Sequence, residues 1–412
     1  MIKNVDKTLV IITILLVSVG IVMVYSATSI MCAKTDWMGG SAYYLKKELF
    51  RVALGSVLMI IAAKIDYRHY KRISWLLLSG TGLLLIATAI PNLAGDSVKG
   101  ATRWLDIGGG SFQPSEFIKI ALIIYLAEYL AKKGKILDRF WGGFAVAVIV
   151  VGAIATIVAL QPNYGMAIAI IMVSAIMFFV AGVPVKFLAY IGLPSVAALT
   201  FAIMHSDHAH RRIVTFIQGG DLLDAGFQIN QSLIALGTGG MIGKGIGNGV
   251  QKLFYVPEIH TDFIFAVIGE ELGFIGAVGV LALFLLFSWR GLKIAMRSPD
   301  GYGCYLAIGL TAMIFVNAAL NIGVVLRLLP TTGIPLPFIS YGGSSLVVAM
   351  ISCGILFNIS SHATRPLKSD LVVVENPIGG LDENNYSRWR HRGTLDPGAE
   401  HSAGASVSPS GH

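Results

Sequence analysis

The chain has 412 residues and a formal net charge of +8; 55% of its residues are hydrophobic and 13% are charged. A soluble globular domain carries about 25% charged residues, so this chain lacks the charge needed to cover a water-facing surface. The basic balance of such a chain reflects membrane topology or anionic lipid, and no nucleic-acid partner is expected. Cys32, Cys304 and Cys353 form no CxxC pair, so neither a zinc site nor a disulfide framework is expected.

The apolar runs predict an all-α polytopic membrane protein with about ten transmembrane helices, because each span needs about 20 mostly apolar residues. The first run follows Lys3 and Lys7 and heads a series of similar runs, so we expect a retained signal-anchor helix rather than a cleaved signal peptide. The expected spans are residues 8–27, 48–65, 73–90, 114–131, 141–160, 164–182, 184–204, 262–289, 303–326 and 338–360.

Basic residues gather in three connections that lie on one side of the membrane if every run spans it. By the positive-inside rule that side is the cytoplasm, so both termini are expected there and the protein is expected in the cytoplasmic membrane. The connections follow spans two, four and eight and contain Lys64, Arg68, Lys71 and Arg72, then Lys132, Lys133, Lys135 and Arg139, and finally Arg290, Lys293 and Arg297.

Two connections on the outer side are long, residues 91–113 and residues 205–261. The second lies between spans seven and eight, contains a glycine-rich stretch and is too apolar for disorder, so we expect it to re-enter the bilayer or lie on its surface. Residues 1–365 form the expected membrane domain. Residues 366–412 end in a Ser/Gly/Pro-rich stretch and form an expected disordered cytoplasmic tail.

The fourth span opens with charged residues. Pro114 suits the first helical position, and Glu116 falls in the first turn, where a carboxylate meets the positive end of the helix dipole. Lys119 lies three residues on, so it shares a face with Glu116 and can pair with it. Two interpretations stay open: an ion pair that steadies the helix end, or a functional pair lining a polar cavity at the outer face. Trp104, just upstream, suits an interface anchor.

Asp262 lies where the long outer loop becomes span eight. It could cap the helix together with Thr261. Alternatively, it could act as a general base or hold a divalent cation such as Mg²⁺ or Mn²⁺ through oxygen, since Glu258 and His260 lie beside it. Glu270 and Glu271 lie about 12–14 Å further into the membrane by helical rise, and we expect them to bind other helices or the loop.

Further polar residues on the outer side suit a pyrophosphate or lipid headgroups, since Arg grips phosphate bidentately and Lys acts as a point charge. The glycine-rich stretch is no P-loop, because Gly245 rather than Ser/Thr follows Gly243-Lys244, so no nucleotide is expected. The small residues that open span ten allow close helix packing, or an opened helix start whose amides face a cavity. The candidate substrate-binding residues are Arg103, Trp104, Arg211, Arg212, Lys244, Lys252, His260, Ser344 and Ser345.

Over most of residues 8–360 these stretches resemble the SEDS family (shape, elongation, division and sporulation) of membrane-embedded peptidoglycan glycosyltransferases. The spacing of Gly247-Asn248, Gln251-Lys252 and Val267–Gly269 looks most like the division branch or its sporulation relative, and less like the elongation branch. The resemblance rests on Lys99-Gly-Ala-Thr-Arg-Trp104, Gln113-Pro-Ser-Glu116, Gln231-Ser-Leu, Gly243-Lys-Gly-Ile-Gly247, Pro257-Glu-Ile-His-Thr-Asp-Phe-Ile-Phe-Ala266, Gly269-Glu-Glu-Leu-Gly273 and Leu336-Pro-Phe-Ile-Ser-Tyr-Gly-Gly-Ser-Ser345. Two positions depart from the family pattern: Asn163 stands where Asp is usual, and Arg327 where a small or neutral residue is usual.

The resemblance implies a polymerase of lipid II that releases undecaprenyl pyrophosphate and works with a class B penicillin-binding protein in the division machinery. It places the catalytic carboxylate at Asp262 and a supporting polar pair at Glu116 and Lys119. Two other classes stay open: a lipid II flippase that uses broken helices with Glu270 and Glu271 as transport elements, and a non-catalytic division scaffold.

Overall fold

The computed structural model describes residues 5–33, 40–88, 104–107, 110–134, 140–190, 225–250 and 260–363, together with the single positions 192, 200, 204, 214 and 216. The expected tail, residues 366–412, lies outside this part of the chain. So do four of the candidate binding residues, Arg103, Arg211, Arg212 and Lys252.

The described part of the chain is almost entirely helical. Its elements are α1 (Lys7–Ala33), α2 (Tyr43–Lys64), α3 (Tyr67–Arg72), α4 (Ser74–Ala87), β1 (Leu105–Ile107), β2 (Gly110–Phe112), α5 (Pro114–Lys133), the π-helix η3 (Phe140–Phe144), α6 (Ala145–Leu160), α7 (Tyr164–Val180), α10 (Ala225–Thr238), α11 (Ile264–Met296), α12 (Gly301–Val325) and α13 (Gly343–His362).

Every expected span except the seventh, residues 184–204, coincides with one of these helices, and most of the seventh lies outside the described residues. Four described helices, α1, α11, α12 and α13, are long and apolar enough to cross a membrane, while α4, α6 and α7 are shorter apolar helices. The chain is therefore an all-α polytopic membrane protein, as predicted.

A small hairpin in the first outer connection was not expected. β1 and β2 pair antiparallel, with Leu105 opposite Phe112 and Ile107 opposite Gly110. The sequence does carry a signal for it, because Gly108-Gly109 separates two short alternating stretches. The hairpin contacts the start of α13 and leads directly into α5, so it lies at the end of the bundle where α5 and α13 begin.

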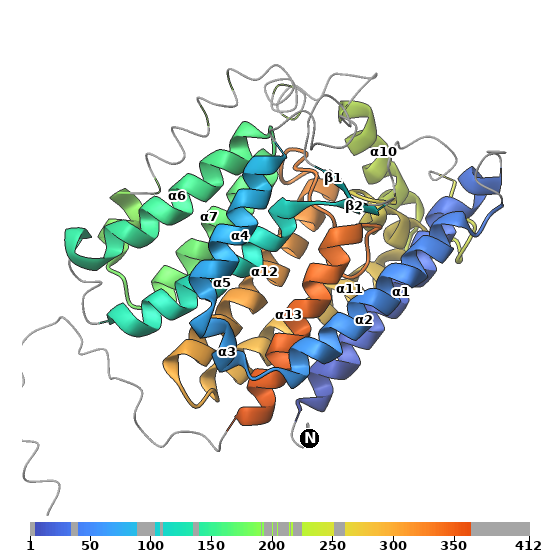
Figure 1. Ribbon diagram of the computed structural model, residues 1–412. Helices are drawn as coiled ribbons and strands as arrows, with labels where there is room; N and C mark the ends of the chain where they lie inside the picture. The colour runs from blue at the N-terminus through green and yellow to red at the C-terminus, as the bar shows by residue number, and fades with distance from the viewer. Residues whose placement is uncertain are drawn as a thin grey trace, which may run out of the picture. The chain divides into compact units, whose positions relative to one another are not determined.

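The centre of the bundle is formed by α12 and α13, which are the most buried of the spanning helices. α12 contacts α5, α7 and α11, and α13 contacts α2 along its length. In Figure 1 the pair α6 and α7 lies on one side of these central helices, and the pair α1 and α2 lies on the other. The charged α5 is thereby enclosed by apolar helices, and this enclosure buries its polar side chains.

α11 is broken at Gly273, which has φ 70° and ψ −167°. This left-handed conformation is unfavourable for a residue that carries a side chain, but glycine adopts it readily. Residues 239–250, which we call the glycine segment, pack against the break: the amides of Phe274 and Ile275 donate to the carbonyls of Gly240 and Met241 at 2.9 and 3.1 Å. The glycine segment therefore enters the bundle, and residues 264–272 form a separate half-helix.

At the other end of the bundle, polar contacts join the helix ends. The Tyr67 amide donates to Oδ1 of Asn358 at 2.9 Å, and the Tyr67 hydroxyl donates to Asp300. Burial, followed by the Asp300 hydrogen bond, raises the pKa of Tyr67 to about 12. Arg290 pairs with Asp6 near the N-terminus. α3 also contacts α5 and α12 and lies at the end opposite the hairpin in Figure 1, so the basic connections gather at one end, as the predicted topology requires.

Candidate active site

Asp262 stands just ahead of α11, beside the segment that joins α12 to α13. The helix begins at Ile264 with Phe263 at the N-cap and no side-chain cap hydrogen bond. Phe263, rather than Asp262, is therefore the N-cap residue of α11. A Cβ placed at Gly333 would lie 3.7 Å from Oδ2 of Asp262, which shows how closely the α12–α13 segment passes the carboxylate.

Asn321 on α12 holds this arrangement together. Its Nδ2 donates to the backbone carbonyls of Asp262 and Ile334, both at 2.8 Å. Asn321 is 1% exposed; its hydrogen bond to Ile334 is buried, and the one to Asp262 is partly buried. The sequence analysis missed this residue. Its signal was a polar side chain inside an apolar span, which is costly and usually functional.

Aromatic residues connect the start of α2 and the start of α13 to the residues just before Asp262. The His260 ring lies 5.1 Å from the Tyr44 ring and 5.5 Å from the Tyr341 ring, between ring centroids. The Tyr341 amide donates to the His260 carbonyl at 2.9 Å. Arg51, another residue that the sequence analysis missed, lies over the Tyr341 ring at 4.2 Å and 3.6 Å from Glu48. His260 is thereby placed at the same end of the bundle as the α13 start.

The start of α13 carries two of the candidate binding residues. The Oγ of Ser344 accepts a hydrogen bond of 3.0 Å from the backbone amide of Gln113, just ahead of α5, and Ser345 is buried. α13 begins after Gly342 with no side-chain cap hydrogen bond. The start of α13 therefore lies close both to the start of α5 and to His260. Trp104 is half-buried beside β1.

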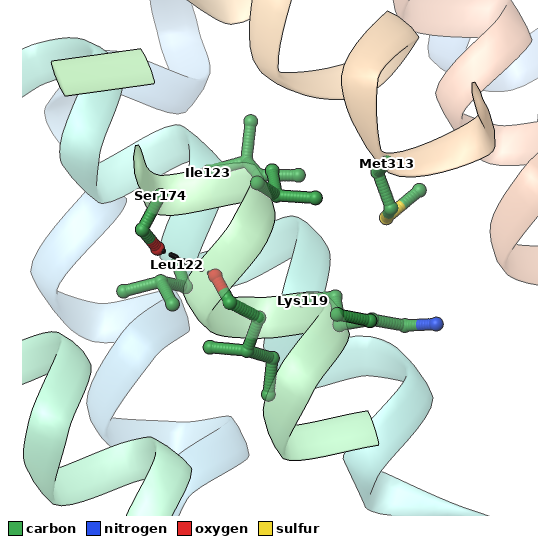
Figure 2. Close-up of a pocket in the computed structure, with 8 residues that line it drawn as sticks. Lys119, Leu122, Ile123, Ser174 and Met313 are labelled. Atoms are coloured by element: carbon green, nitrogen blue, oxygen red, sulfur yellow. Dashed lines mark hydrogen bonds between the residues drawn. The ribbon is translucent and has the colours of Figure 1, made fainter. Parts of the chain in front are cut away.

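Glu116 and Lys119 form the predicted ion pair, with Nζ and Oε2 2.9 Å apart and the side chains only 2% and 3% exposed. Burial of both charges is costly unless they stay paired, so breaking this buried ion pair would destabilise the protein. Beside Lys119 lies a cavity of about 10 Å³, room for about one water molecule. It is lined by Lys119, Leu122, Ile123, Ala169, Ile170, Val173, Ser174 and Met313 (Figure 2), so its walls are mostly apolar.

α12 lies beside Lys119 of the ion pair and also contacts Asp262. Met313, Asn317 and Asn321 are spaced four residues apart and share one face of that helix. Met313 lines the cavity with Lys119, whereas Asn321 binds the Asp262 backbone. Eight residues of α-helix rise by about 12 Å, so the ion pair and Asp262 meet the same face of α12 at levels about 12 Å apart.

Lys244 has a protein partner in this structure. Its Nζ lies 2.8 Å from Oε1 of Glu270, which is 1% exposed. Glu271 accepts hydrogen bonds from Ser26 on α1 and from the Gly247 amide. Glu270 and Glu271 therefore bind the glycine segment and another helix, as expected. A contact between Lys244 and substrate stays a prediction, as do phosphate contacts of Arg103, Arg211, Arg212 and Lys252.

The possible cation site has few ligands in the part of the chain described here. Within it, no group of three or more His, Cys, Asp or Glu side chains is arranged to hold a metal ion. A divalent cation takes six or more oxygen ligands, so a cation at Asp262 would need oxygens from elsewhere. Of the two departures from the family pattern, Asn163 is the buried N-cap residue of α7 and Arg327 follows the end of α12.

The chain matches the model of a protein family described as cell cycle proteins, FtsW, RodA and SpoVE, over residues 6–365. The chain belongs to this family. It is 40% identical over 362 residues to the probable peptidoglycan glycosyltransferase FtsW of Geobacter sp. strain M18, covering 88% of this chain and 98% of that protein. It is 39% identical over 360 residues to the stage V sporulation protein E of Bacillus subtilis strain 168, covering 87% and 97%.

Solved structures show the same fold. Thermus thermophilus RodA aligns with a TM-score of 0.66 and 25% identity, over 88% of this chain and 99% of that one. A chain from a peptidoglycan synthase complex that coordinates polymerization and crosslinking aligns with a TM-score of 0.70 and 24% identity, over 87% of this chain and 98% of that one. The family prediction is confirmed, and the chain is a multi-pass membrane protein.

Proposed function

We propose that this chain is a peptidoglycan glycosyltransferase that polymerises lipid II at the outer face of the cytoplasmic membrane, in division or sporulation. The observation that carries the proposal is the placement of Asp262: Asn321 holds its backbone, and its carboxylate lies close to Gly333 in the segment that joins α12 to α13. Relatives named FtsW that are 40% identical over nearly their whole length support the same activity.

In the proposed reaction, the sugar 4-hydroxyl of one lipid II attacks the anomeric carbon of the growing chain. The new glycosidic bond forms as the bond to undecaprenyl pyrophosphate breaks, and the hydroxyl proton passes to the Asp262 carboxylate. A positioned carboxylate of this kind contributes about 10²–10⁴-fold. The departing pyrophosphate needs positive charge, for which we propose Arg103, Arg211, Arg212 and Lys252. A divalent cation at Asp262 stays a proposal, and no step of this reaction depends on it.

The buried pair Glu116–Lys119 supports the reaction from within the bundle. Its enclosure by α5, α7 and α12 keeps the two charges in a low-dielectric environment, where their field is screened less than in water. We propose that the pair sets the electrostatic potential at the outer end of α12, where Asn321 binds the Asp262 segment. His260, Ser344, Ser345 and Trp104, grouped at the outer end, are proposed to contact the sugar or the phosphates.

The proposed orientation places both termini in the cytoplasm and the hairpin, α10 and Asp262 outside. The basic helix ends at the α3 side of the bundle support it, because the positive-inside rule assigns such an end to the cytoplasm. A class B penicillin-binding protein is the proposed partner, together with other division proteins. The solved complex in which a similar chain takes part in polymerization and crosslinking supports this partnership.

The arrangement of the two intramembrane glutamates favours the polymerase over a flippase. Transport elements line a path for their cargo, whereas Glu270 and Glu271 are 0% and 1% exposed and bind Lys244, Val250, Ser26 and Gly247. We favour a catalytic role over a pure scaffold because relatives 40% identical to this chain are named probable peptidoglycan glycosyltransferases.

The test is polymerisation of labelled lipid II by the purified protein, with and without a cognate class B penicillin-binding protein, read on a gel. We expect long glycan, more of it with the partner. Asp262→Asn should lose about two or more orders of magnitude in rate while melting at nearly the wild-type temperature. An Asp262→Asn variant that polymerises at the wild-type rate would remove Asp262 from the mechanism and return the flippase and the scaffold to consideration.

A further inference from the structure

The break in α11 is an interlocked joint between two chain segments. The amides of Lys244 and Gly245 donate to the carbonyls of Glu270 and Glu271, both at 3.0 Å, so the glycine segment satisfies carbonyls that the broken helix leaves without helical partners. With the amides of Phe274 and Ile275 bonded back to the glycine segment, donors and acceptors on both sides of the break are paired. The break is therefore a stable feature of the fold.

Glycines make this joint possible because the two backbones nearly touch. A Cβ at Gly239 would lie 1.9 Å from the Gly269 carbonyl oxygen, and a Cβ at Gly243 would lie 2.2 Å from the Glu271 carbonyl oxygen. A Cβ at Gly273 would lie 2.3 Å from the Gly243 amide nitrogen. Distances below 3.0 Å exclude a side chain, so the two segments fit in one arrangement with little freedom to slide.

Two buried carboxylates fasten the joint to its surroundings. The Ser26 hydroxyl donates to the Glu271 carboxylate, whose oxygens lie 2.8 and 2.7 Å from Oγ, and the Gly247 amide donates to Oε2 at 3.1 Å. Oε1 of Glu270 accepts from Lys244 Nζ at 2.8 Å and from the Val250 amide at 2.9 Å. Glu271 thus ties the base of the half-helix to α1, a helix 245 residues away in sequence.

The opposite end of the half-helix begins directly after Asp262. From Phe263 to Glu271 the helical rise is about 12 Å, so a tilt of about 10° at the base would move the Asp262 end by about 2 Å. A displacement of about 1 Å of a reacting group can cost about 100-fold in rate. A small tilt at the base of the half-helix would therefore reach the Asp262 carboxylate.

We propose that Glu271 is a positioning residue for Asp262: through Ser26 it anchors the half-helix to α1 and so sets the place of the carboxylate. The effect is indirect, since Glu271 is buried and touches the joint rather than the outer end of the bundle. The inference rests on the proposed function in that Asp262 is taken as the reaction base. Its consequence for the place of residue 262 can be measured without the reaction.

The kinetic test compares Glu271→Gln, Ser26→Ala and the double variant, with Ser29→Ala as the matched control one turn along α1. Glu271→Gln should lower kcat by about tenfold or more and leave KM within about twofold, because the base moves while the substrate contacts stay. Ser26→Ala should lower kcat in the same direction, and the double variant should be no worse than Glu271→Gln, because both changes break one link. Ser29→Ala should match the wild type, since its hydroxyl reaches only the Ser26 carbonyl at 3.4 Å.

The second test measures the accessibility of residue 262 directly. Asp262→Cys is made in a background in which Cys32, Cys304 and Cys353 are replaced by Ala, and the rate of maleimide labelling is measured in membranes. Adding Glu271→Gln or Ser26→Ala should change that rate by about threefold or more if the joint sets the position of residue 262, whereas adding Ser29→Ala should not change it.

The outcomes separate this inference from the proposed function. Equal thiol rates with and without Glu271→Gln overturn the positioning role, and so does a Glu271→Gln variant whose melting temperature falls while kcat per folded protein stays at the wild-type value. A wild-type protein that makes no glycan overturns the proposed function, and the thiol rates then still decide whether Glu271 positions residue 262.

Discussion

Asn321 and Asp262, 59 residues apart in sequence, are joined by a partly buried hydrogen bond of 2.8 Å from the Nδ2 of Asn321 to the backbone carbonyl of Asp262. The same Nδ2 binds the Ile334 carbonyl, so one amide group holds the proposed base and the α12–α13 segment against each other. The contact fixes the main chain of Asp262.

We predict that Asn321→Leu lowers polymerisation more than it lowers stability. Both carbonyls lose their donor, which costs about 1–3 kcal/mol for each buried group left unsatisfied, and the Asp262 backbone is released. We expect kcat to fall by about tenfold or more, measured beside a melting curve. Asn317→Leu, one turn earlier on the same face of α12, is the matched control and should keep its rate. Equal rates for the two variants would contradict the role of Asn321.

We predict that Lys119→Met is strongly destabilising, because it leaves the Glu116 carboxylate buried without its cation. Breaking a buried pair costs about 3–5 kcal/mol, whereas replacing both partners is often neutral. The double variant Glu116→Gln/Lys119→Met should therefore melt near the wild-type temperature. Thermal unfolding in detergent measures this difference.

The polymerisation rate of the same double variant shows whether the ion pair acts in the reaction or only in folding. If the pair supplies the potential that the reaction needs, the double variant folds but polymerises lipid II at least about tenfold more slowly. Wild-type polymerisation by a well-folded double variant would reduce the pair to a structural element.

We predict that Arg327→Gly stabilises the protein. Arg327 has φ 55° at the end of α12, where its amide donates to the Val324 carbonyl at 3.0 Å and the Leu328 amide donates to the Gly323 carbonyl at 2.8 Å. This is the Schellman arrangement, which favours glycine at the left-handed position. The substitution should raise stability by about 1 kcal/mol.

The matched control for that prediction is Arg327→Ala, which removes the charge but keeps a Cβ at the left-handed position. It should show no gain in melting temperature. If both variants gain equally, the charge rather than the backbone conformation accounts for the effect.

We predict that the hairpin and α10 face outward and that α3 faces the cytoplasm. Single cysteines at Lys47, exposed near the start of α2 where Tyr44 contacts His260, and at Lys71, in α3, test this in a background without the native cysteines. The Lys47→Cys thiol should react with an impermeant maleimide applied outside spheroplasts, and the Lys71→Cys thiol only after permeabilisation. The reverse pattern would invert the topology and remove the outer-face substrate argument.

Much of the architecture could be predicted from the sequence. The positions of the spans follow from runs of apolar residues, and the proposed orientation rests on Lys71, Arg290 and similar residues between them. Both are local properties of the chain, set by transfer of side chains from water to lipid. Asp262, Glu116 and Lys119 were identified because charged groups at span ends are few, and their types and spacing limit their chemistry.

Only the tertiary structure decided how those residues are held. The bond between Ser26 and Glu271 joins positions 245 apart, and that between Asn321 and Asp262 joins positions 59 apart. The break at Gly273 exists because the glycine segment supplies partners for its backbone. Such contacts depend on which helices pack together and at what level. Apolar runs predict that a helix crosses the membrane, but any apolar face packs against lipid or another helix, so local pattern does not choose the partner.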